Sequence, residues 1–323
     1  MPRKRKINSD NAFGTIAGLL ITSVLIGVRH IFLFSIEVLK FILKCLWRIL
    51  LFILVFIIEY FEKRSIRKKT ILLNNQTSTL NEPLNPNQHL QLKELYEDYY
   101  LKLISSIKSI NAFDRKLSYP LLIAPFDNYY RSNEKIMFIG KETRYWILDG
   151  QNKFLSENIP QDKVINQLLL NYKQFNFGAN YIKSPFWQFC HNLYKEITLA
   201  DNNDGFIWNN LSKIDENGTT PTWDVIKAST AFYPIIKEEI KILKPEIVIF
   251  LTGNTFDEYL KYLFSDLKFI PINSQFMRVS HCELPFHSYR TSHPKRLRLV
   301  GTFDQVIKDL ASEVKKEQPA MIE

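Results

Sequence analysis

The stretch EIVIFLTG, residues 246–253, decides the fold class of this 323-residue chain. Five consecutive apolar residues lie between Glu246 and Thr252, three of them β-branched, and the stretch ends in Gly253. A short, continuous apolar run that ends at a turn residue is typical of a buried strand in a parallel sheet. We therefore predict a strand here, followed by a helix over residues 255–264.

Apolar runs alternate with helical patterns on both sides of this strand. KIMFIG (135–140), FIWNN (206–210) and residues 268–272 predict three further strands. Apolar side chains at helical spacing predict helices over 89–110, 185–198, 227–243 (which Pro234 should break or start) and 302–315, with a hydrophilic loop before the last. This alternation predicts an α/β fold, a three-layer α/β/α sandwich with a mainly parallel four-stranded sheet.

The N-terminal region has a different composition, because residues 13–58 are overwhelmingly apolar. One transmembrane helix needs about 20 apolar residues, and this stretch is about twice that length. Two spans in a hairpin are one interpretation. The alternative is one span followed by an interfacial helix, because Glu37, Lys40, Lys44 and Arg48 recur at steps of three and four residues.

The net positive charge of the chain comes entirely from its first 70 residues. Residues 1–70 hold 13 of the 42 Lys and Arg residues but only 4 of the 33 Asp and Glu residues, which leaves 29 of each over residues 71–323. The net charge of +9 therefore reflects basic flanks of a membrane segment and is no evidence for nucleic-acid binding. Basic residues on both flanks favour the hairpin, with both ends in the cytoplasm.

These features predict a domain organisation and a location. We expect a membrane segment over 1–69, a polar linker over 70–88, an α/β domain over 89–317 and a short tail over 318–323. Three cysteines are too few for a disulfide framework, which favours a reducing compartment. We therefore predict a protein of the cell membrane, with the lipid bilayer as a partner and the soluble domain facing the cytoplasm.

Polar residues follow three of the predicted strands or lie in the last loop. They are Gly140 to Arg144 (GKETR), the pair Asn209 and Asn210, and Thr291 to Leu297 (TSHPKRL). Ligands of parallel α/β sheets bind at the carboxyl ends of the strands. We therefore expect these segments to form one site.

A carboxylate, an amide and a His-Pro loop in this order resemble the uracil-DNA glycosylase superfamily, whose first motif is Gly-Gln-Asp-Pro-Tyr and whose last is His-Pro-Ser-Pro-Leu. Gly140 and Glu142 match the Gly and the Asp, and His293, Pro294 and Leu297 match the His, the Pro and the final Leu. The resemblance covers roughly residues 130–317. Thr143 and Arg144 stand where Pro and Tyr are expected, so it does not imply uracil specificity.

The resemblance implies cleavage of an N-glycosidic bond, and the residues suit that chemistry. Glu142 would stabilise positive charge on the sugar and orient a water, while His293 would donate a hydrogen bond to the departing base. Asn210 would read the base edge, since an amide can donate and accept together. Lys141 would keep Glu142 ionised.

The remaining candidates would hold the base or the phosphates. Phe186 or Trp187 would stack on an extruded base, Leu297 would fill the space it leaves, and a run of cations near residue 295 would contact phosphates. The expected site is, for catalysis, Glu142 and His293; for substrate binding, Gly140, Lys141, Phe186, Trp187, Asn209, Asn210 and Leu297; and for phosphate, Arg290, Lys295 and Arg296.

Several of these residues also have a structural interpretation. Phe186 and Trp187 share core spacing with Phe189 and Leu193, Leu297 suits a core, and the cations suit anionic lipid as well as phosphate. The spacing of His281, Cys282 and His287 matches no established zinc site. We expect neither a metal nor a cofactor.

The sequence thus predicts a membrane-anchored, glycosylase-like protein that recognises a nucleobase in DNA or in a nucleotide. Hydrolysis of the N-glycosidic bond is one hypothesis. A non-catalytic nucleotide or DNA sensor coupled to the membrane segment is the alternative, and a pore-forming protein with a regulatory soluble part is a third.

Overall fold

The computed structural model describes residues 85–199, 204–230 and 234–316, together with Trp47. The elements of its first half are α2 (Pro86–Ser109), η1 (Phe113–Arg115), α3 (Asp127–Arg131), β1 (Ile136–Glu142), α4 (Gln161–Phe175), η2 (Asn176–Tyr181), α5 (Pro185–Thr198) and β2 (Phe206–Ser212). The second half continues with α6 (Trp223–Thr230), α7 (Ile235–Leu243), β3 (Ile247–Phe250), η3 (Asn254–Phe256), α8 (Asp257–Leu263), β4 (Lys268–Pro271), β5 (Phe276–Ser280), β6 (His287–Thr291), α9 (Pro294–Leu299) and α10 (Phe303–Val314).

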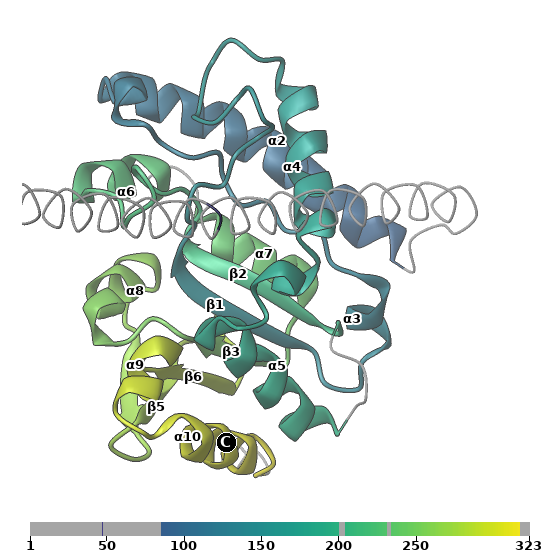
Figure 1. Cartoon of the computed structure of the whole chain (residues 1–323), viewed down its shortest axis with the longest axis vertical. Helices are drawn as coiled ribbons and strands as arrows, with labels where there is room; N and C mark the ends of the chain where they lie inside the picture. Colours follow the sequence, from purple (N-terminus) through teal and green to yellow (C-terminus); the bar gives the residue numbers. More distant parts are fainter. Residues whose placement is uncertain (1–46, 48–84, 200–203, 231–233, 317–323) are drawn as a thin grey trace, which may run out of the picture. The chain divides into compact units, whose positions relative to one another are not determined.

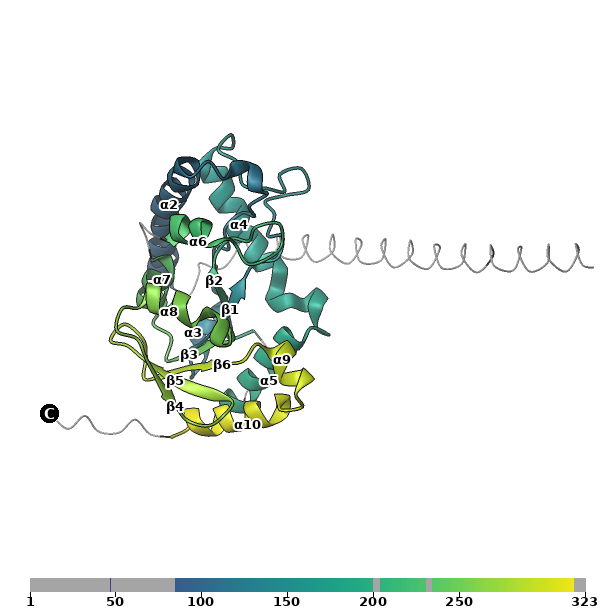
Figure 2. The ribbon, with the colours of Figure 1, turned by 90° about the vertical axis from the view of Figure 1, so that its left-hand side faces the viewer.

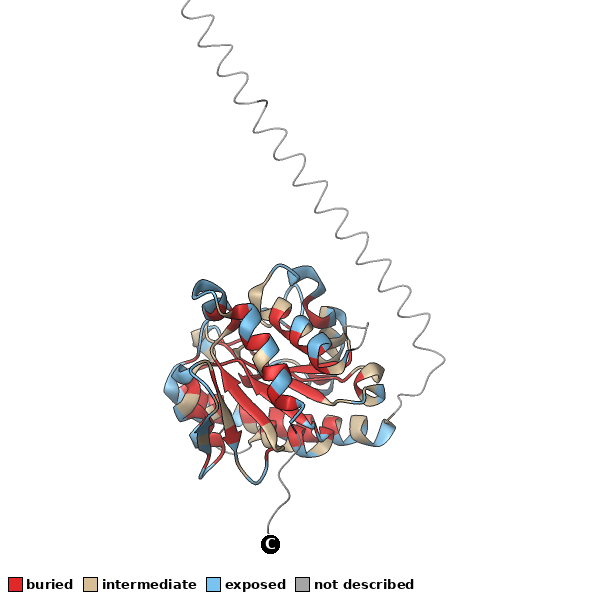
Figure 3. Ribbon diagram, turned by 90° about the horizontal axis from the view of Figure 1, so that it is seen from below, coloured by how far each residue is buried: buried red, intermediate tan, exposed pale blue. Residues whose placement is uncertain are grey.

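The core of the fold is a six-stranded mixed sheet in the order β2-β1-β3-β6-β5-β4 (Figure 1). Strands β2, β1, β3 and β6 run parallel, and β5 is antiparallel to both of its neighbours. Helices α2, α6, α7 and α8 lie on one side of the sheet, while α5, α9 and α10 lie on the other (Figure 2). The strands between these layers are largely buried (Figure 3).

The predicted four-stranded, mainly parallel sheet is wrong. Residues 268–271 do form a strand, but it is the outermost one and is antiparallel to β5. The segment predicted as a hydrophilic loop contains β5 and β6, and β6 is the fourth parallel strand. Its sequence, HSYRT, has no apolar run. Polar side chains are tolerated in this buried strand because they have partners in the fold, as the Arg290 guanidinium does in the Asp257 carboxylate at 2.7 Å.

Other predicted elements are confirmed with shifted ends. The strands at 136, 206 and 247 form as β1, β2 and β3, and helices form close to the predicted ranges near residues 89, 185 and 302. The predicted helix 227–243 is two helices, α6 and α7, because Pro234 occupies the N-cap of the second and cannot continue a helix. Helix α4 and the short helix α9 were not predicted.

The first 69 residues, for which a membrane segment is predicted, lie outside the described residues apart from Trp47. Among the helices that the structure describes, none combines the length and the apolar character needed to cross a bilayer.

Strand β2 forms one edge of the sheet, and side chains occupy its outer backbone groups. The Tyr172 hydroxyl, from α4, accepts from the Trp208 N–H at 3.1 Å and donates to the Trp208 carbonyl at 2.9 Å. Two residues on, the Asn210 N–H donates to the Asn209 side-chain oxygen at 2.8 Å. The opposite edge, β4, is mostly exposed and includes Lys268 and Pro271.

Candidate functional site

The ends of β1 and β2 lie side by side, and Gly140 stands opposite Asn210 in their parallel register. A Cβ atom at Gly140 would overlap the Asn210 side-chain oxygen and would press on the Phe186 ring at 3.3 Å. Glycine is therefore required here for space. Its missing side chain lets an amide from β2 and an aromatic ring from α5 meet above the end of β1.

The Asn210 side chain is the least satisfied polar group of this cluster. Asn210 is only 3% exposed, yet its side-chain amide makes no hydrogen bond to any of the described residues. Neither polar atom of this amide is completely buried, and an amide offers two donors and a carbonyl acceptor. The Asn210 amide is thus available to a ligand that presents both an acceptor and a donor.

Two rings from different helices complete the same cluster. The Phe186 and His293 rings stack with centroids 6.0 Å apart and an angle of 27° between their planes. Phe186 lies in the first turn of α5, and His293 is the N-cap of α9. The segments near residues 140, 210 and 293 therefore lie together, whereas no hydrogen bond or ion pair joins Glu142 to Asn210 or His293 within the described residues.

The protonation of His293 is defined by its surroundings. Its Nδ1 accepts a hydrogen bond from the Lys295 backbone N–H at 3.2 Å, which assigns the hydrogen of a neutral ring to Nε2. Burial, together with the positive charges of Lys141, Lys295 and Arg144, lowers the pKa of His293 to about 4. At neutral pH this imidazole is an uncharged Nε2–H donor.

We expect His293 to remain neutral from pH 7 down to about pH 4, whereas an ordinary histidine is half-protonated at pH 6.5. Between about pH 4 and pH 6.5 the unfolded chain therefore binds more protons at this histidine than the folded chain. The contribution of His293 to the free energy of unfolding rises with pH across this range and is lost as the pH falls. An NMR titration of the histidine Cε1–H signals, assigned with His293→Gln, measures the midpoint. A midpoint near 6.5 would contradict the buried, cation-flanked environment.

Glu142 ends β1 two residues after Gly140, so alternation along the strand places both on one face of the sheet. Its Oε2 accepts a hydrogen bond from the Thr220 hydroxyl at 2.9 Å. Burial raises the pKa of Glu142, opposed by the Thr220 hydrogen bond and by the charges of Lys141 and Arg144. The positive charges of Lys141 and Arg144 act on His293 as well.

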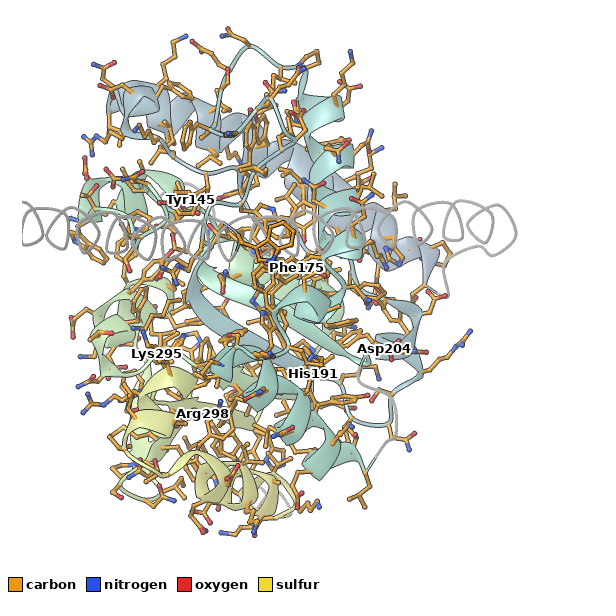
Figure 4. All side chains as sticks on the ribbon, viewed as in Figure 1. Tyr145, Phe175, His191, Asp204, Lys295 and Arg298 are labelled. Carbon is orange, nitrogen blue, oxygen red and sulfur yellow. The ribbon has the colours of Figure 1, made fainter. Side chains whose placement is uncertain are left out.

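The predicted phosphate contacts divide into free and paired cations. Lys295 and Arg296 are exposed, and neither forms an ion pair within the described part of the chain. Figure 4 shows Lys295 at the end of the molecule where β2 finishes, far from Asp204, which precedes the start of β2. Arg290 is instead buried and bound to Asp257, so it is not available for phosphate.

Three predicted base-binding residues are placed elsewhere. Trp187 packs in the core with its ring edge-on to Trp208, at a centroid distance of 5.1 Å, so only Phe186 of the predicted aromatic pair lies at the site. Leu297 is fully buried and cannot fill a space left by a base. Asn209 points to the opposite face of β2 from Asn210.

Asn209 belongs to a fully buried ionic network. Its side-chain nitrogen donates to Glu239 at 2.8 Å, and its oxygen accepts from Lys213 at 2.5 Å. The Lys213 ammonium also contacts the Glu239 carboxylate at 2.7 Å, and the Tyr96 hydroxyl donates to the same carboxylate at 3.0 Å. The Asn209 side-chain oxygen also accepts from the Asn210 N–H. The network therefore fixes the backbone of Asn210, whose side-chain amide lies at the candidate site.

Two residues near Glu142 carry no sequence signal that would have identified them. Thr220, the hydrogen-bond partner of Glu142, lies in a loop 78 positions along the chain. Thr143 follows Glu142, and its hydroxyl donates to the buried Asp215 carboxylate at 2.9 Å. The Thr143 hydroxyl thus helps to fix the loop after β1.

Three hollows of about 330, 340 and 340 Å³ lie away from this cluster. The first lies between α2 and α4, the second beside α2 at residues 157–161, and the third near Asp127 and Asp204. Neither the unpartnered amide nor the imidazole lines them. We therefore place the candidate site at the convergent side chains and not at these hollows.

No family model matches the chain, and no curated protein is similar enough to it to count as a match. The assignment of function therefore depends on the site itself.

Proposed function

We propose that Gly140, Glu142, Phe186, Asn210 and His293, hereafter the strand-end site, recognise a nucleobase in DNA or in a nucleotide and hydrolyse its N-glycosidic bond. The protein that carries this site would be anchored in the cell membrane through residues 1–69, with the site in the cytoplasm. The proposal is supported chiefly by the Asn210 amide, which forms no hydrogen bond with any described residue and adjoins an aromatic ring and a neutral imidazole.

Each group has a role in this reaction. The Phe186 ring would stack on the base, and the Asn210 amide would pair with its edge. As the bond between the sugar C1′ and the base nitrogen breaks, its electron pair stays with the base, and the His293 Nε2–H donates a hydrogen bond to that developing negative charge.

The sugar loses electron density at the same time, and the Glu142 carboxylate stabilises the resulting cation. Glu142 also orients a water whose oxygen bonds to C1′. The proton that this water loses goes to Glu142, and the departing base takes up a proton from solvent, so atoms and charge balance. The exposed Lys295 and Arg296 would hold the phosphates on either side.

The proposal is tested with the full-length chain in detergent micelles. Oligonucleotides that carry deaminated or modified bases, and the corresponding nucleotides, are incubated with the protein, and free base is quantified by mass spectrometry. We expect release from at least one substrate. Gly140→Ala should weaken binding of that substrate by about 10- to 100-fold, because its Cβ displaces the Asn210 amide at a cost of roughly 1–3 kcal/mol.

Gly150→Ala is the matched control, because a Cβ at Gly150 meets nothing within 4 Å. Thermal stabilisation by a nucleotide without base release would favour the sensor alternative over the enzyme. If no substrate of the panel gives either base release or thermal stabilisation, the strand-end site is refuted.

A further inference from the structure

Two exposed segments lie close in sequence to Phe186 and His293 of the strand-end site. One is the end of η2 with the residues that follow it, where Tyr181 and Ile182 are 57% and 65% exposed. The other is the end of α9, where Leu299 and Val300 are 78% and 55% exposed. Helices α5 and α9 lie side by side on one face of the sheet (Figures 1 and 2), and the stack of Phe186 on His293 joins their first turns.

Cations accompany these exposed apolar side chains. Lys183 follows Ile182, and Lys295, Arg296 and Arg298 precede Leu299. The sequence contains no acidic residue between Asp162 and Glu196 and none between Glu283 and Asp304. Within the described residues, the side chains of Lys183, Lys295 and Arg296 form no ion pair. The two segments thus combine unpaired positive charge with apolar surface.

Tyr181 is held in place as a flat platform. Its ring stacks on Phe175 with centroids 5.7 Å apart and an angle of 27° between the planes, while more than half of the residue remains exposed. A ring supported on one face loses little conformational freedom when a second ring stacks on the other.

We propose that this surface, termed the apolar-basic rim and made of Tyr181, Ile182, Lys183 and residues 295–300, binds single-stranded nucleic acid. The proposal rests on the proposed function, because it names the form of nucleic acid that the strand-end site receives. Unpaired bases expose ring faces that stack on Tyr181 and contact Leu299, and the cations pair with the backbone phosphates. In a duplex, neighbouring bases already cover those faces.

The test uses the full-length chain in nanodiscs of uncharged lipid, and a fluorescent 20-nucleotide strand without any modified base, alone or in a duplex. Fluorescence anisotropy gives the Kd at several salt concentrations. We expect the single strand to bind at least about 10-fold more tightly than the duplex, since stacking contributes to each unpaired base. Tyr181→Ser should weaken single-strand binding by about 5- to 100-fold.

Tyr262→Ser is the matched control, because Tyr262 is also an exposed tyrosine against an aromatic ring, that of Trp223 on another face. Ile182→Ser is an independent second variant, and thermal melting verifies that each variant is folded. Lys183→Gln should lower the slope of log K against log salt by about 0.7, whereas Lys268→Gln should not.

Equal affinity for duplex and single strand would overturn the rim proposal, as would a Tyr181→Ser protein that binds like the Tyr262→Ser control. Binding of phosphatidylserine vesicles without binding of the single strand would overturn it in favour of a lipid surface. Single-strand binding without base release would support the rim proposal and contradict the proposed hydrolysis. Base release without a preference for the single strand would support the proposed hydrolysis and contradict the rim proposal.

Discussion

Replacement of Glu142 by Gln is expected to lower base release by about 10²- to 10³-fold, a typical cost of losing one electrostatic stabiliser in an active site. The amide keeps the size of the side chain and can still accept the hydrogen bond of Thr220, which the carboxylate accepts at 2.9 Å. It cannot carry the negative charge that stabilises the sugar cation or take a proton from water. The measurement is single-turnover release of the base by the full-length chain.

Substrate binding should change little in Glu142→Gln, because the Asn210 amide and the Phe186 ring are untouched. Glu258→Gln is the control, since Glu258 is an exposed residue of α8 that pairs with Lys261 at 2.8 Å. An undiminished rate in Glu142→Gln would remove the carboxylate from the mechanism. Equal losses of rate in both variants would point to a general effect of altered charge.

Lys213→Met should be the most destabilising substitution that we propose, with a loss of about 3–5 kcal/mol in the free energy of unfolding. Both charges of the Lys213–Glu239 pair are almost completely inaccessible to water. Removal of the ammonium leaves the Glu239 carboxylate buried with only Asn209 and Tyr96 as hydrogen-bond partners among the described residues. Urea unfolding, followed by tryptophan fluorescence, measures the change.

The double variant Lys213→Met, Glu239→Gln should regain part of the lost stability, because it removes the unpaired charge. Lys261→Met, which breaks an exposed pair with Glu258, should cost no more than about 1 kcal/mol. A loss below about 1 kcal/mol in Lys213→Met would mean that water or a rearranged side chain replaces the ammonium.

Strands were predictable where burial alone determines their composition. β1, β2 and β3 lie inside the sheet or beneath helices, and their apolar runs are visible in the sequence. β6 is equally central but reads as polar, because its side chains are satisfied by partners distant in sequence. Besides the Arg290 contact with Asp257, the Thr291 hydroxyl donates to the Gln275 carbonyl at 3.1 Å. Such pairs are visible only in three dimensions.

The same distinction applies to the candidate site. The order of polar residues at the strand ends suggested Gly140, Glu142, Asn210 and His293 as candidates, because parallel strands end at one edge of a sheet. The sequence did not reveal which of two adjacent residues faces the site. Asn209 and Asn210 are chemically identical, and only the position of the sheet face separates a member of the buried ionic network from an unpartnered amide.

The occupied outer backbone of β2 also governs how copies of this chain can associate. With the Trp208 peptide groups bound by Tyr172 and the Asn210 N–H bound by Asn209, a foreign strand finds few free partners there. Growth of the sheet into a larger assembly would have to proceed from β4, where Lys268 adds charge and Pro271 lacks an N–H. Polymerisation through β-strand addition is therefore disfavoured at both ends of the sheet, which protects a protein concentrated in two dimensions on a membrane, as we propose for this one.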